Sequence, residues 1–425
     1  MTKFEPVLTR NTRYPDSEKI ATYLAHGGYE TARSAVKMQP DAIIEMVKRS
    51  GLRGRGGAGF PAGVKWGFMP TDAPQKIVAV NTDEGEPGTF KDREIVERDP
   101  HSVIEGVIIA AYAVGANRAY VYIRGEFFLG VKRWIKAIAD AYEQGCLGKN
   151  IFGSGFDLDM SVHRGAGAYI CGEETAMIES LEGKRGSPRL KPPYPAQIGL
   201  FGLPTLVHNI ETLACIPHIV GRGPEWFAGI GTAESKGPKI FSVSGHVNQP
   251  GNYELPLGIS LREIIYEYAG GMRGGRALKA VIPGGASTPM LTASQVDVPM
   301  AFETLKAAGS ELGTGAIVVM DETTCMVEAA CRLSKFFAHE SCGRCTPCRV
   351  GSVRLYEILE RIRRGKGQKD DIEFILEIAR GIDGNTFCPM GAALVNPARS
   401  AIQHFRDEFE YHIANQRCPV SGKPN

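Results

Sequence analysis

The sequence predicts an α/β fold in which a parallel sheet carries helices on its faces, joined to a small α+β domain and a helical C-terminal region. Short apolar runs alternate with helical patterns between residues 76 and 183, which is typical of a parallel sheet with crossover helices. A two-strand pattern with a Pro-Gly turn (239–258) then precedes a single helical segment. From residue 326 onward helical patterns dominate.

Two stretches interrupt the alternation: a glycine run, GLRGRGGAGFPAGVKW (51–66), and a proline-rich stretch (187–204) that we interpret as an ordered loop. A change of composition near 222–238 marks a domain boundary. The expected domains are 1–235, 239–325 and 326–425. Strands are expected at 76–80, 118–125 and 156–165, and helical segments at 18–50, 101–115, 127–144, the second half of 165–183, and 208–220.

Composition excludes several classes of protein. The 425 residues include 49 Lys and Arg against 47 Asp and Glu, for a formal net charge of +2, which argues against a general nucleic-acid binder. The longest apolar run, 103–114, is far shorter than the ~20 residues that cross a bilayer. The first 25 residues lack the apolar centre of a secretion signal. We therefore expect a protein of the cytoplasmic side without a membrane span.

Three of the ten cysteines fall within seven residues, in SCGRCTPC (341–348). In a large intracellular chain such spacing favours a metal site over a disulfide framework. Cys342, Cys345 and Cys348 can surround one corner of a cuboidal cluster, and Cys388, followed by Pro389, is the candidate fourth ligand. This arrangement resembles ferredoxin-type [4Fe–4S] ligation.

Two alternatives stay open for these cysteines. A structural zinc site also uses four cysteines, although usually in two C-x2-C pairs, and the thiols could simply be buried core residues. The other six cysteines, Cys171 among them, are predicted to be small core residues. Between Arg344 and Lys369 there are eight basic residues against two glutamates, so the surroundings of the cluster are expected to be basic unless this is a solvated helix face.

The glycine run contains G-x-G-x-x-G (54–59). It follows a helical pattern and not a strand, so a standard dinucleotide fingerprint is not expected. Closely spaced glycines nevertheless let backbone N–H groups approach a phosphate or a flat ring. Arg53, Arg55 and Lys65 add positive charge, and Phe60, Trp66 and Phe68 offer rings for stacking. The alternative is a glycine-rich surface turn.

Two acidic segments complete the candidate site. Glu173 and Glu174 stand at the start of a predicted helix, where they either cap the helix or accept hydrogen bonds from a ribose and repel a 2′-phosphate. Asp83, Glu84 and Glu86 lie in one short loop and could bind a hard cation, although no calcium-loop pattern is present.

These motifs, together with NTDEGEPGTFKDRE (81–94), the segment from GAGAYICGEETA (165–176) to HNIETLA (208–214), and TFCPMGA (386–392), occur in one order. In that order they resemble the NADH-binding, FMN-containing flavoprotein subunit of respiratory complex I, over nearly the whole chain. The resemblance implies a Rossmann-like FMN domain, a ubiquitin-like β domain and a C-terminal helical bundle.

The resemblance also implies three cofactors or substrates, namely one FMN, one [4Fe–4S] cluster held by the four cysteines named above, and NADH. No side chain need act as an acid or base, because the flavin carries the chemistry. The implied FMN contacts are Gly54, Arg55, Gly56, Gly57, Gly59, Lys65, Asn81, Asp83, Glu84, Gly172, Glu173, Asn209 and Thr212. The implied NADH contacts are Phe60, Phe68, Glu86, Tyr169, Glu174, Lys191 and Tyr194.

The implied reaction is hydride transfer from NADH to FMN, after which single electrons pass to the cluster and through partner subunits to quinone. Glu86 and Glu174 would orient NADH, and we expect Glu174 to discriminate against NADPH. Implied partners are the small [2Fe–2S] subunit and the large iron–sulfur subunit, on the cytoplasmic side of the inner membrane, or the matrix side in an organelle.

Two alternatives stay open for the whole chain. One is a diaphorase subunit of an NAD-linked hydrogenase or formate dehydrogenase, which the compact chain disfavours. The other is an iron–sulfur scaffold without a working flavin site.

Overall fold

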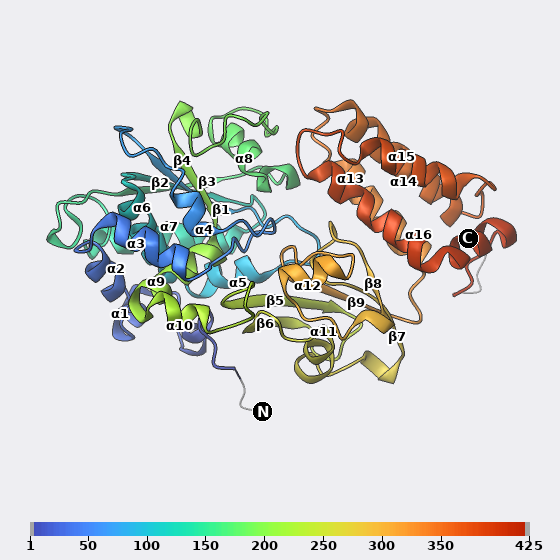
Figure 1. Cartoon of the computed structure of the whole chain (residues 1–425), viewed down its shortest axis with the longest axis horizontal. Helices are drawn as coiled ribbons and strands as arrows, with labels where there is room; N and C mark the ends of the chain where they lie inside the picture. The colour runs from blue at the N-terminus through green and yellow to red at the C-terminus, as the bar shows by residue number, and fades with distance from the viewer. Residues whose placement is uncertain (1–3, 421–425) are drawn as a thin grey trace. The chain divides into compact units, whose positions relative to one another are not determined.

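The computed structural model describes residues 4–420, and the chain divides into two compact units (Figure 1). The first unit contains the chain up to Gly85, Thr89–Phe241 and Glu254–Ile259. The second contains Glu86–Gly88, Ser242–Tyr253 and the chain from Ser260 onward. The chain therefore passes between the units several times, and neither is one continuous segment.

Four parallel strands form the sheet of the first unit, in the order β3-β2-β1-β4 (Figure 1). They are Ile77–Thr82 (β1), Arg118–Ile123 (β2), Asp159–Arg164 (β3) and Thr205–Asn209 (β4). The first three confirm the predicted parallel sheet. β4 is a correction, because the sequence predicted a loop and then a helix there. β1 is central and almost completely buried, as expected for a strand covered on both faces.

The helix Pro100–Val114 (α6) is buried nearly all round and packs against β1, β2 and Ile210–Arg222 (α9). A side chain at Gly106 would collide with the backbone of Leu213, so α6 and α9 approach at backbone distance there. Glu105 interrupts the apolar run of α6. Its carboxylate accepts hydrogen bonds from the Tyr23 hydroxyl and from the backbone N–H groups of Tyr29 (3.0 Å) and Ala32 (2.9 Å), which fastens the N-terminal helices to α6.

The stretch 18–50, predicted to be helical, contains three short helices, because Tyr29 adopts a left-handed conformation and Pro40 begins a new helix. The remaining helices of this unit are Ile20–Ala25 (α1), Glu30–Ala35 (α2), Pro40–Arg49 (α3), Ala62–Trp66 (α4), Lys91–Arg98 (α5), Phe128–Glu143 (α7), Glu174–Leu181 (α8) and Pro224–Ala228 (α10). Short 3-10 turns are Arg10–Arg13, Ile151–Gly153, Tyr169–Gly172 and Leu200–Gly202.

A second, mixed sheet has the order β6-β5-β9-β7-β8, in which β9 runs parallel to β5 and antiparallel to β7. Its first two strands are neighbours, which agrees with the predicted two-strand pattern. The strands are Pro238–Gly245 (β5), Gly251–Pro256 (β6), Leu278–Ile282 (β7), Leu291–Thr292 (β8) and Ala316–Asp321 (β9). The short helical pieces are Leu261–Glu263 (α11), Ile264–Tyr268, Arg273–Gly275, Ala293–Gln295 and Phe302–Ala307 (α12).

Four helices close the second unit, as the sequence predicted (Figure 1). They are Met326–Glu340 (α13), Thr346–Arg363 (α14), Asp371–Ile382 (α15) and Met390–Asn415 (α16). α13 packs against α14 and α16, and α15 packs against the same two helices. Among residues 4–420, no helix is long and apolar enough to span a membrane.

Candidate functional site

The carboxyl ends of β1 and β4 form the first part of the candidate site. The strand order changes direction here, since β2 and β3 follow on one side of β1 and β4 lies on the other. Open parallel sheets bind ligands outside the carboxyl ends of the strands at such a switch point. Asn81 and Asn209, the asparagines predicted from the resemblance, are direct partners in the register of β1 and β4. The sheet therefore brings two segments 128 residues apart to one edge.

The loop after β1 is tied to the segment before α8. The Asn81 side-chain amide donates to the Gly172 carbonyl (2.9 Å), and its oxygen accepts from the backbone N–H of Asp83 (2.9 Å). A Cβ on Gly172 would stand 3.3 Å from the Asp83 carbonyl oxygen, so glycine permits this close approach. Asn81, Asp83 and Gly172 thus form one wall at the sheet edge.

The segment 54–59, here called the glycine loop, is fixed against the start of α9. The Arg55 backbone N–H donates to the Thr212 hydroxyl (2.8 Å), and Asn209 caps α9 by accepting from the Glu211 N–H (3.0 Å). A Cβ on Gly56 would lie 3.1 Å from the Asn209 Cβ. The glycine loop follows α3 and precedes α4, which confirms that no strand-turn-helix fingerprint is present.

Two glycines of the loop need their backbone freedom, since Gly57 has φ +132° and Gly59 has φ +64°. The loop closes on itself through the Gly54 N–H, which donates to the Phe60 carbonyl (2.8 Å), and through the Arg53 Nε, which donates to the Gly59 carbonyl (2.7 Å). The loop is therefore held in one conformation by its own hydrogen bonds.

The Arg55 side chain is completely buried beneath the glycine loop. One guanidinium nitrogen donates to the Lys236 carbonyl (2.7 Å), whereas Nε and Nη1 make no hydrogen bond within residues 4–420. Arg55 therefore ties the loop to the segment before β5, and its charge lies near enough to Glu211 to lower the pKa of that carboxyl group.

A buried charge cluster shares this region. The Glu211 carboxylate lies 2.8 Å from the Lys91 ammonium and 3.0 Å from that of Lys239. Burial alone would raise the pKa of Glu211, but Lys239 and Lys91 outweigh it and lower the pKa to about 2. Lys91 also contacts Asp92 (2.6 Å). Three buried cations, counting Arg55, thus lie near three carboxylates, those of Glu211, Asp92 and Glu84. Burial raises the pKa of Glu84 to about 8, so at neutral pH the cluster keeps a net positive charge, which suits an anionic phosphate at the loop.

A second network of charges lies beside the loop. The Glu174 carboxylate lies 2.9 Å from the Lys65 ammonium and 2.8 Å from that of Lys191, which also contacts Glu173 (3.0 Å). Burial raises the pKa of Glu174, but the two lysines outweigh burial and lower the pKa to about 2. Glu173 confirms the capping interpretation, because its carboxylate accepts from two N–H groups at the start of α8. These four predicted site residues are therefore contiguous.

Three of the four aromatic residues predicted to contact NADH are exposed, and Tyr169 is partly buried. Phe60, Phe68 and Tyr194 expose 48%, 57% and 55% of their surface, and the Phe60 and Phe68 ring centroids lie 6.1 Å apart. Tyr169 packs against Gly85, where a Cβ would stand 3.1 Å from its ring. Exposed aromatic rings of this kind can stack on a planar ligand.

The acidic loop does not form the cation site considered above. Glu84 accepts from the backbone N–H groups of Asp92 (2.8 Å) and Arg93 (3.0 Å), so it caps α5, and burial raises its pKa to about 8. Glu86 accepts from the Ser287 N–H (2.6 Å) inside the second unit. Between residues 4 and 420, the carboxylates of this loop do not converge on one point.

The four predicted cluster cysteines lie in two loops at one end of the C-terminal helices. Cys342, Cys345 and Cys348 occupy the connection from α13 to α14 and the first turn of α14, and Cys388 lies between α15 and α16. Burial raises the pKa of the Cys348 thiol, and the nearby Cys345 and Cys342 thiols raise this pKa further. The Arg344 guanidinium lies 5.1 Å from the Phe387 ring centroid, which brings the two loops together.

The helix that starts at this cluster favours negative charge. Cys345 is the N-cap residue of α14, and the positive end of the helix dipole stabilises thiolates. Four of the eight basic residues counted from the sequence form ion pairs: Arg354 with Glu357, Arg361 with Asp371, and Arg363 and Arg364 with Glu360. The basic charge expected from the sequence is therefore offset in part, by carboxylates on α14 and α15.

Sequence reasoning missed the buried ions beneath the glycine loop. Lys91, Glu211 and Lys239 are at most 1% exposed, yet each lies next to apolar residues in the sequence. For Glu211 and Lys239 the available signal was a charged residue within or beside an apolar segment, because such a residue is buried only when it is paired. Lys91 lies in the polar run KDRE and gave no such signal.

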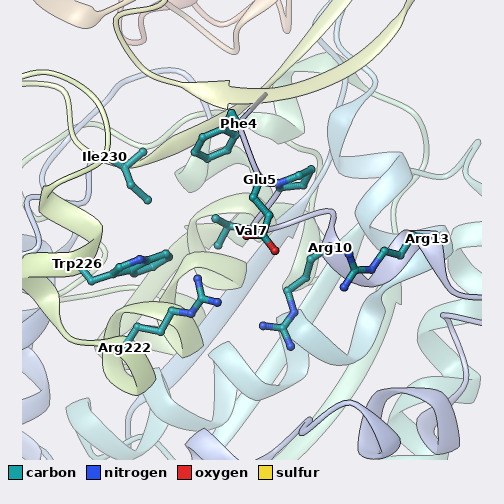
Figure 2. Close-up of a pocket in the computed structure, with 9 residues that line it drawn as sticks. Phe4, Glu5, Val7, Arg10, Arg13, Arg222, Trp226 and Ile230 are labelled. Carbon is teal, nitrogen blue, oxygen red and sulfur yellow. The ribbon is translucent and has the colours of Figure 1, made fainter. Parts of the chain in front are cut away.

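A separate cavity of about 480 Å³ lies in the first unit (Figure 2). Figure 2 shows Trp226 and Arg222 on one side of it and Arg10 and Arg13 on the other. α9 begins at the carboxyl end of β4, and Arg222 is its last residue, so this cavity lies at the far end of α9 from the sheet edge. None of the predicted site residues lines it.

Three family models match the chain. They are the Nuo51 FMN-binding domain at residues 47–218, the SLBB domain at 239–319, and the NADH-ubiquinone oxidoreductase-F iron-sulfur binding region at 328–412. The sheet edge with its glycine loop falls inside the first match, and the four cluster cysteines fall inside the third. The chain is thus an oxidoreductase subunit with an FMN-binding domain and an iron–sulfur region.

Relatives that match nearly the whole chain show to which family of oxidoreductase subunits it belongs. The chain is 56% identical over 418 residues to the F 2 subunit of NADH-quinone oxidoreductase of Rhizobium meliloti, covering 98% of this chain and 99% of the relative. It is 51% identical over 426 residues to the F subunit of NADH-quinone oxidoreductase of Mycobacterium tuberculosis, covering 98% and 96%. The crystal structure of NAD+-reducing [NiFe]-hydrogenase in the H2-reduced state is also similar, with TM-score 0.85 and 38% identity over 96% of this chain and 67% of that chain. The chain belongs to the family of NADH-quinone oxidoreductase F subunits.

Proposed function

We propose that this chain oxidises NADH at the edge formed by β1, β4 and the glycine loop, and passes the electrons to an iron–sulfur cluster at the end of α13–α16. The observation that carries the proposal is the pairing of Asn81 with Asn209 at the switch point of the sheet, next to a glycine loop with net positive charge beneath it. This arrangement fits a phosphate and a flat ring, as FMN would supply.

The residues proposed to hold FMN divide by position. The glycine loop presents backbone groups, Arg55 and Thr212 fix that loop from below, and Asn209 and Asn81 stand at the strand ends. Glu84 acts through α5, which it caps. The full proposed set is Gly54, Arg55, Gly56, Gly57, Gly59, Lys65, Asn81, Asp83, Glu84, Gly172, Glu173, Asn209 and Thr212.

The residues proposed to bind NADH are the exposed aromatic rings and the charged network. Phe60 and Phe68 stack on the adenine, and Glu174, held by two lysines, accepts hydrogen bonds from a ribose. Glu86 orients NADH from its loop. The full proposed set is Phe60, Phe68, Glu86, Tyr169, Glu174, Lys191 and Tyr194.

When bound, FMN supplies the hydride acceptor, and the [4Fe–4S] cluster supplies the one-electron acceptor. Cys342, Cys345, Cys348 and Cys388 are the proposed ligands, and the N-terminus of α14 stabilises their negative charge. The protein orients the nicotinamide and excludes water, and no side chain donates or accepts a proton in the hydride step.

The domain organisation follows from the same proposal. We assign a Rossmann-like FMN and NADH domain to residues 1–235, a ubiquitin-like domain to 239–325 and a cluster-bearing helical bundle to 326–425. The subunit names of the relatives support assembly into a larger complex. We propose the small [2Fe–2S] subunit and the large iron–sulfur subunit as neighbours, in the peripheral arm on the cytoplasmic side.

The flavin half of the proposal is tested with Gly56→Val in the full chain. The added side chain must enter the space of Asn209, so the variant is expected to lose FMN absorbance and NADH–ferricyanide activity while keeping its iron. Gly381→Val is the control, because Gly381 lies in α15 with open space around its Cα. A Gly56→Val chain that retains flavin and activity would contradict the proposed site.

A further inference from the structure

A cysteine, a histidine and a second cysteine meet at the end of the C-terminal helices opposite the iron–sulfur loops. The Cys325 Sγ lies 3.3 Å from the His412 Nε2, and these atoms and the Cys418 Sγ all lie within 4.8 Å of one another. Among residues 4–420, this is the one group of three such side chains that converges. Neither cysteine belongs to the set proposed for the cluster.

The backbone positions all three groups. Cys325 is the N-cap residue of α13, and its sulfur accepts from the Glu328 N–H (3.5 Å). His412 lies in the last turn of α16, and Cys418 follows the end of that helix, where Gln416 takes a left-handed conformation that turns the chain back. α13 and α16 pack together, so their two ends supply one site.

We propose that Cys325, His412 and Cys418 bind a zinc ion. A tetrahedral zinc with Zn–S of about 2.3 Å and Zn–N of about 2.0–2.1 Å holds two sulfurs about 3.8 Å apart and a sulfur and nitrogen about 3.6 Å apart. The Cys325–His412 separation of 3.3 Å is close to that size, and the Cys418 sulfur lies within 4.8 Å of both atoms. Thiolate with imidazole is a donor set that selects zinc over hard cations, and a water molecule completes the four ligands.

Burial and a neighbouring carboxylate support a resident ion. His412 is 1% exposed and Cys418 is 8% exposed, whereas Cys325 is partly exposed and gives the ion a path to the site. Glu408, one turn before His412, accepts from the Met326 N–H (3.0 Å) and lies 2.5 Å from the Lys279 ammonium. It thereby holds α16 against the start of α13. The zinc would fasten the last turn of the chain in the same place.

The site is separate from the iron–sulfur loops. α13 has 15 residues, so its two ends are roughly 20 Å apart at 1.5 Å per residue. The iron–sulfur loop follows the C-terminal end of α13, and the proposed zinc site lies at its N-terminal end. Changes at one site should therefore leave the metal at the other.

The test is metal analysis of the full chain purified with its iron. We expect about one zinc per chain besides the iron, lost in His412→Gln and Cys418→Ser and retained in Cys331→Ser, a control at a buried cysteine of α13. Cys388→Ser should lose iron and keep zinc. X-ray absorption at the zinc edge of the unaltered chain should show two sulfur ligands and one nitrogen, a readout that does not depend on any variant.

Three results would overturn the proposal. One is a chain that holds no zinc and takes up neither Zn2+ nor Co2+ after treatment with a chelator. Another is zinc that disappears only with Cys388→Ser, which would place it at the iron–sulfur cysteines. The third is a Cys325–Cys418 disulfide found by mass spectrometry of the native chain.

Discussion

Replacing Glu174 by glutamine changes the charge of the network beside the glycine loop and little else. The four groups Lys65, Lys191, Glu173 and Glu174 carry no net charge at neutral pH. Glutamine keeps the volume and one hydrogen-bonding oxygen, but the set becomes singly positive. We expect the variant to accept NADPH far better than the unaltered chain does.

Two energies set the expected effects of this substitution, one on stability and one on the preference between NADPH and NADH. For stability, the difference between the ordinary pKa of 4.5 and about 2 in the folded chain corresponds to roughly 3 kcal/mol of favourable interaction for ionised Glu174, of which the glutamine amide recovers a part. For selectivity, one unit of charge about 6 Å from a 2′-phosphate, at an effective dielectric constant of about 20, is worth about 3 kcal/mol per phosphate charge before screening by salt. A rise of at least about tenfold in the NADPH/NADH ratio of kcat/KM is therefore expected.

The assay is ferricyanide reduction with either nucleotide at low ionic strength. Glu182→Gln is the matched control, since Glu182 ends the same helix and also pairs with a lysine and an arginine, Lys184 and Arg189, but is not among the proposed nucleotide contacts. It should leave the ratio unchanged. An unchanged ratio in Glu174→Gln, with flavin retained, would refute the reasoning.

Acid denaturation gives a second readout of the same charge. Because the pKa of Glu174 is lower in the folded chain than in the unfolded chain, its contribution to stability is present above about pH 4.5 and disappears as the pH falls toward about 2. The difference in unfolding free energy between the unaltered chain and Glu174→Gln should shrink over that interval. A difference that does not vary with pH would show that the carboxylate is not held by the two lysines.

Three other substitutions test separate parts of the site. Glu211→Gln leaves the buried cations with one anion fewer and should lower the unfolding free energy in urea by about 3–5 kcal/mol. The control Glu225→Gln, at an exposed ion pair, should change the unfolding free energy by less than about 1 kcal/mol. Equal effects of the two substitutions would contradict the proposed burial of charge. Cys388→Ser should abolish the reduced-cluster signal in electron paramagnetic resonance while NADH still bleaches the flavin, and an unchanged signal would exclude Cys388 as a ligand. Phe68→Ala should raise the KM for NADH several-fold without flavin loss, and an unchanged KM would remove Phe68 from the nucleotide site.

The sequence predicts those parts of the fold in which local pattern and burial agree. β1 and α6 are continuous apolar segments, and both lie where they were expected. β4 was missed because Thr205–Asn209 follows a proline-rich loop and runs directly into α9, so its few apolar residues look like the beginning of that helix. Asn209 itself carries the missing signal, since it caps α9 and so ends the strand.

The site could be predicted where it depends on short spacing and not where it depends on distant pairing. The cysteines of SCGRCTPC are close in sequence, and Cys342 and Cys345 lie near enough to Cys348 to raise the pKa of its thiol. Cys325, His412 and Cys418 are brought together only by the packing of α13 against α16, and their spacing gives no motif. The charge around Arg361 could not be judged from local spacing for the same reason, because its partner Asp371 lies on the next helix.

The most direct test of the central claim is the absorption and electron paramagnetic resonance spectrum of the purified full chain before and after addition of NADH. The proposed function predicts oxidised flavin absorbance that NADH bleaches, together with the appearance of a reduced [4Fe–4S] signal. A chain that carries iron at Cys342, Cys345, Cys348 and Cys388 but shows no flavin, or whose flavin NADH does not bleach, would contradict it.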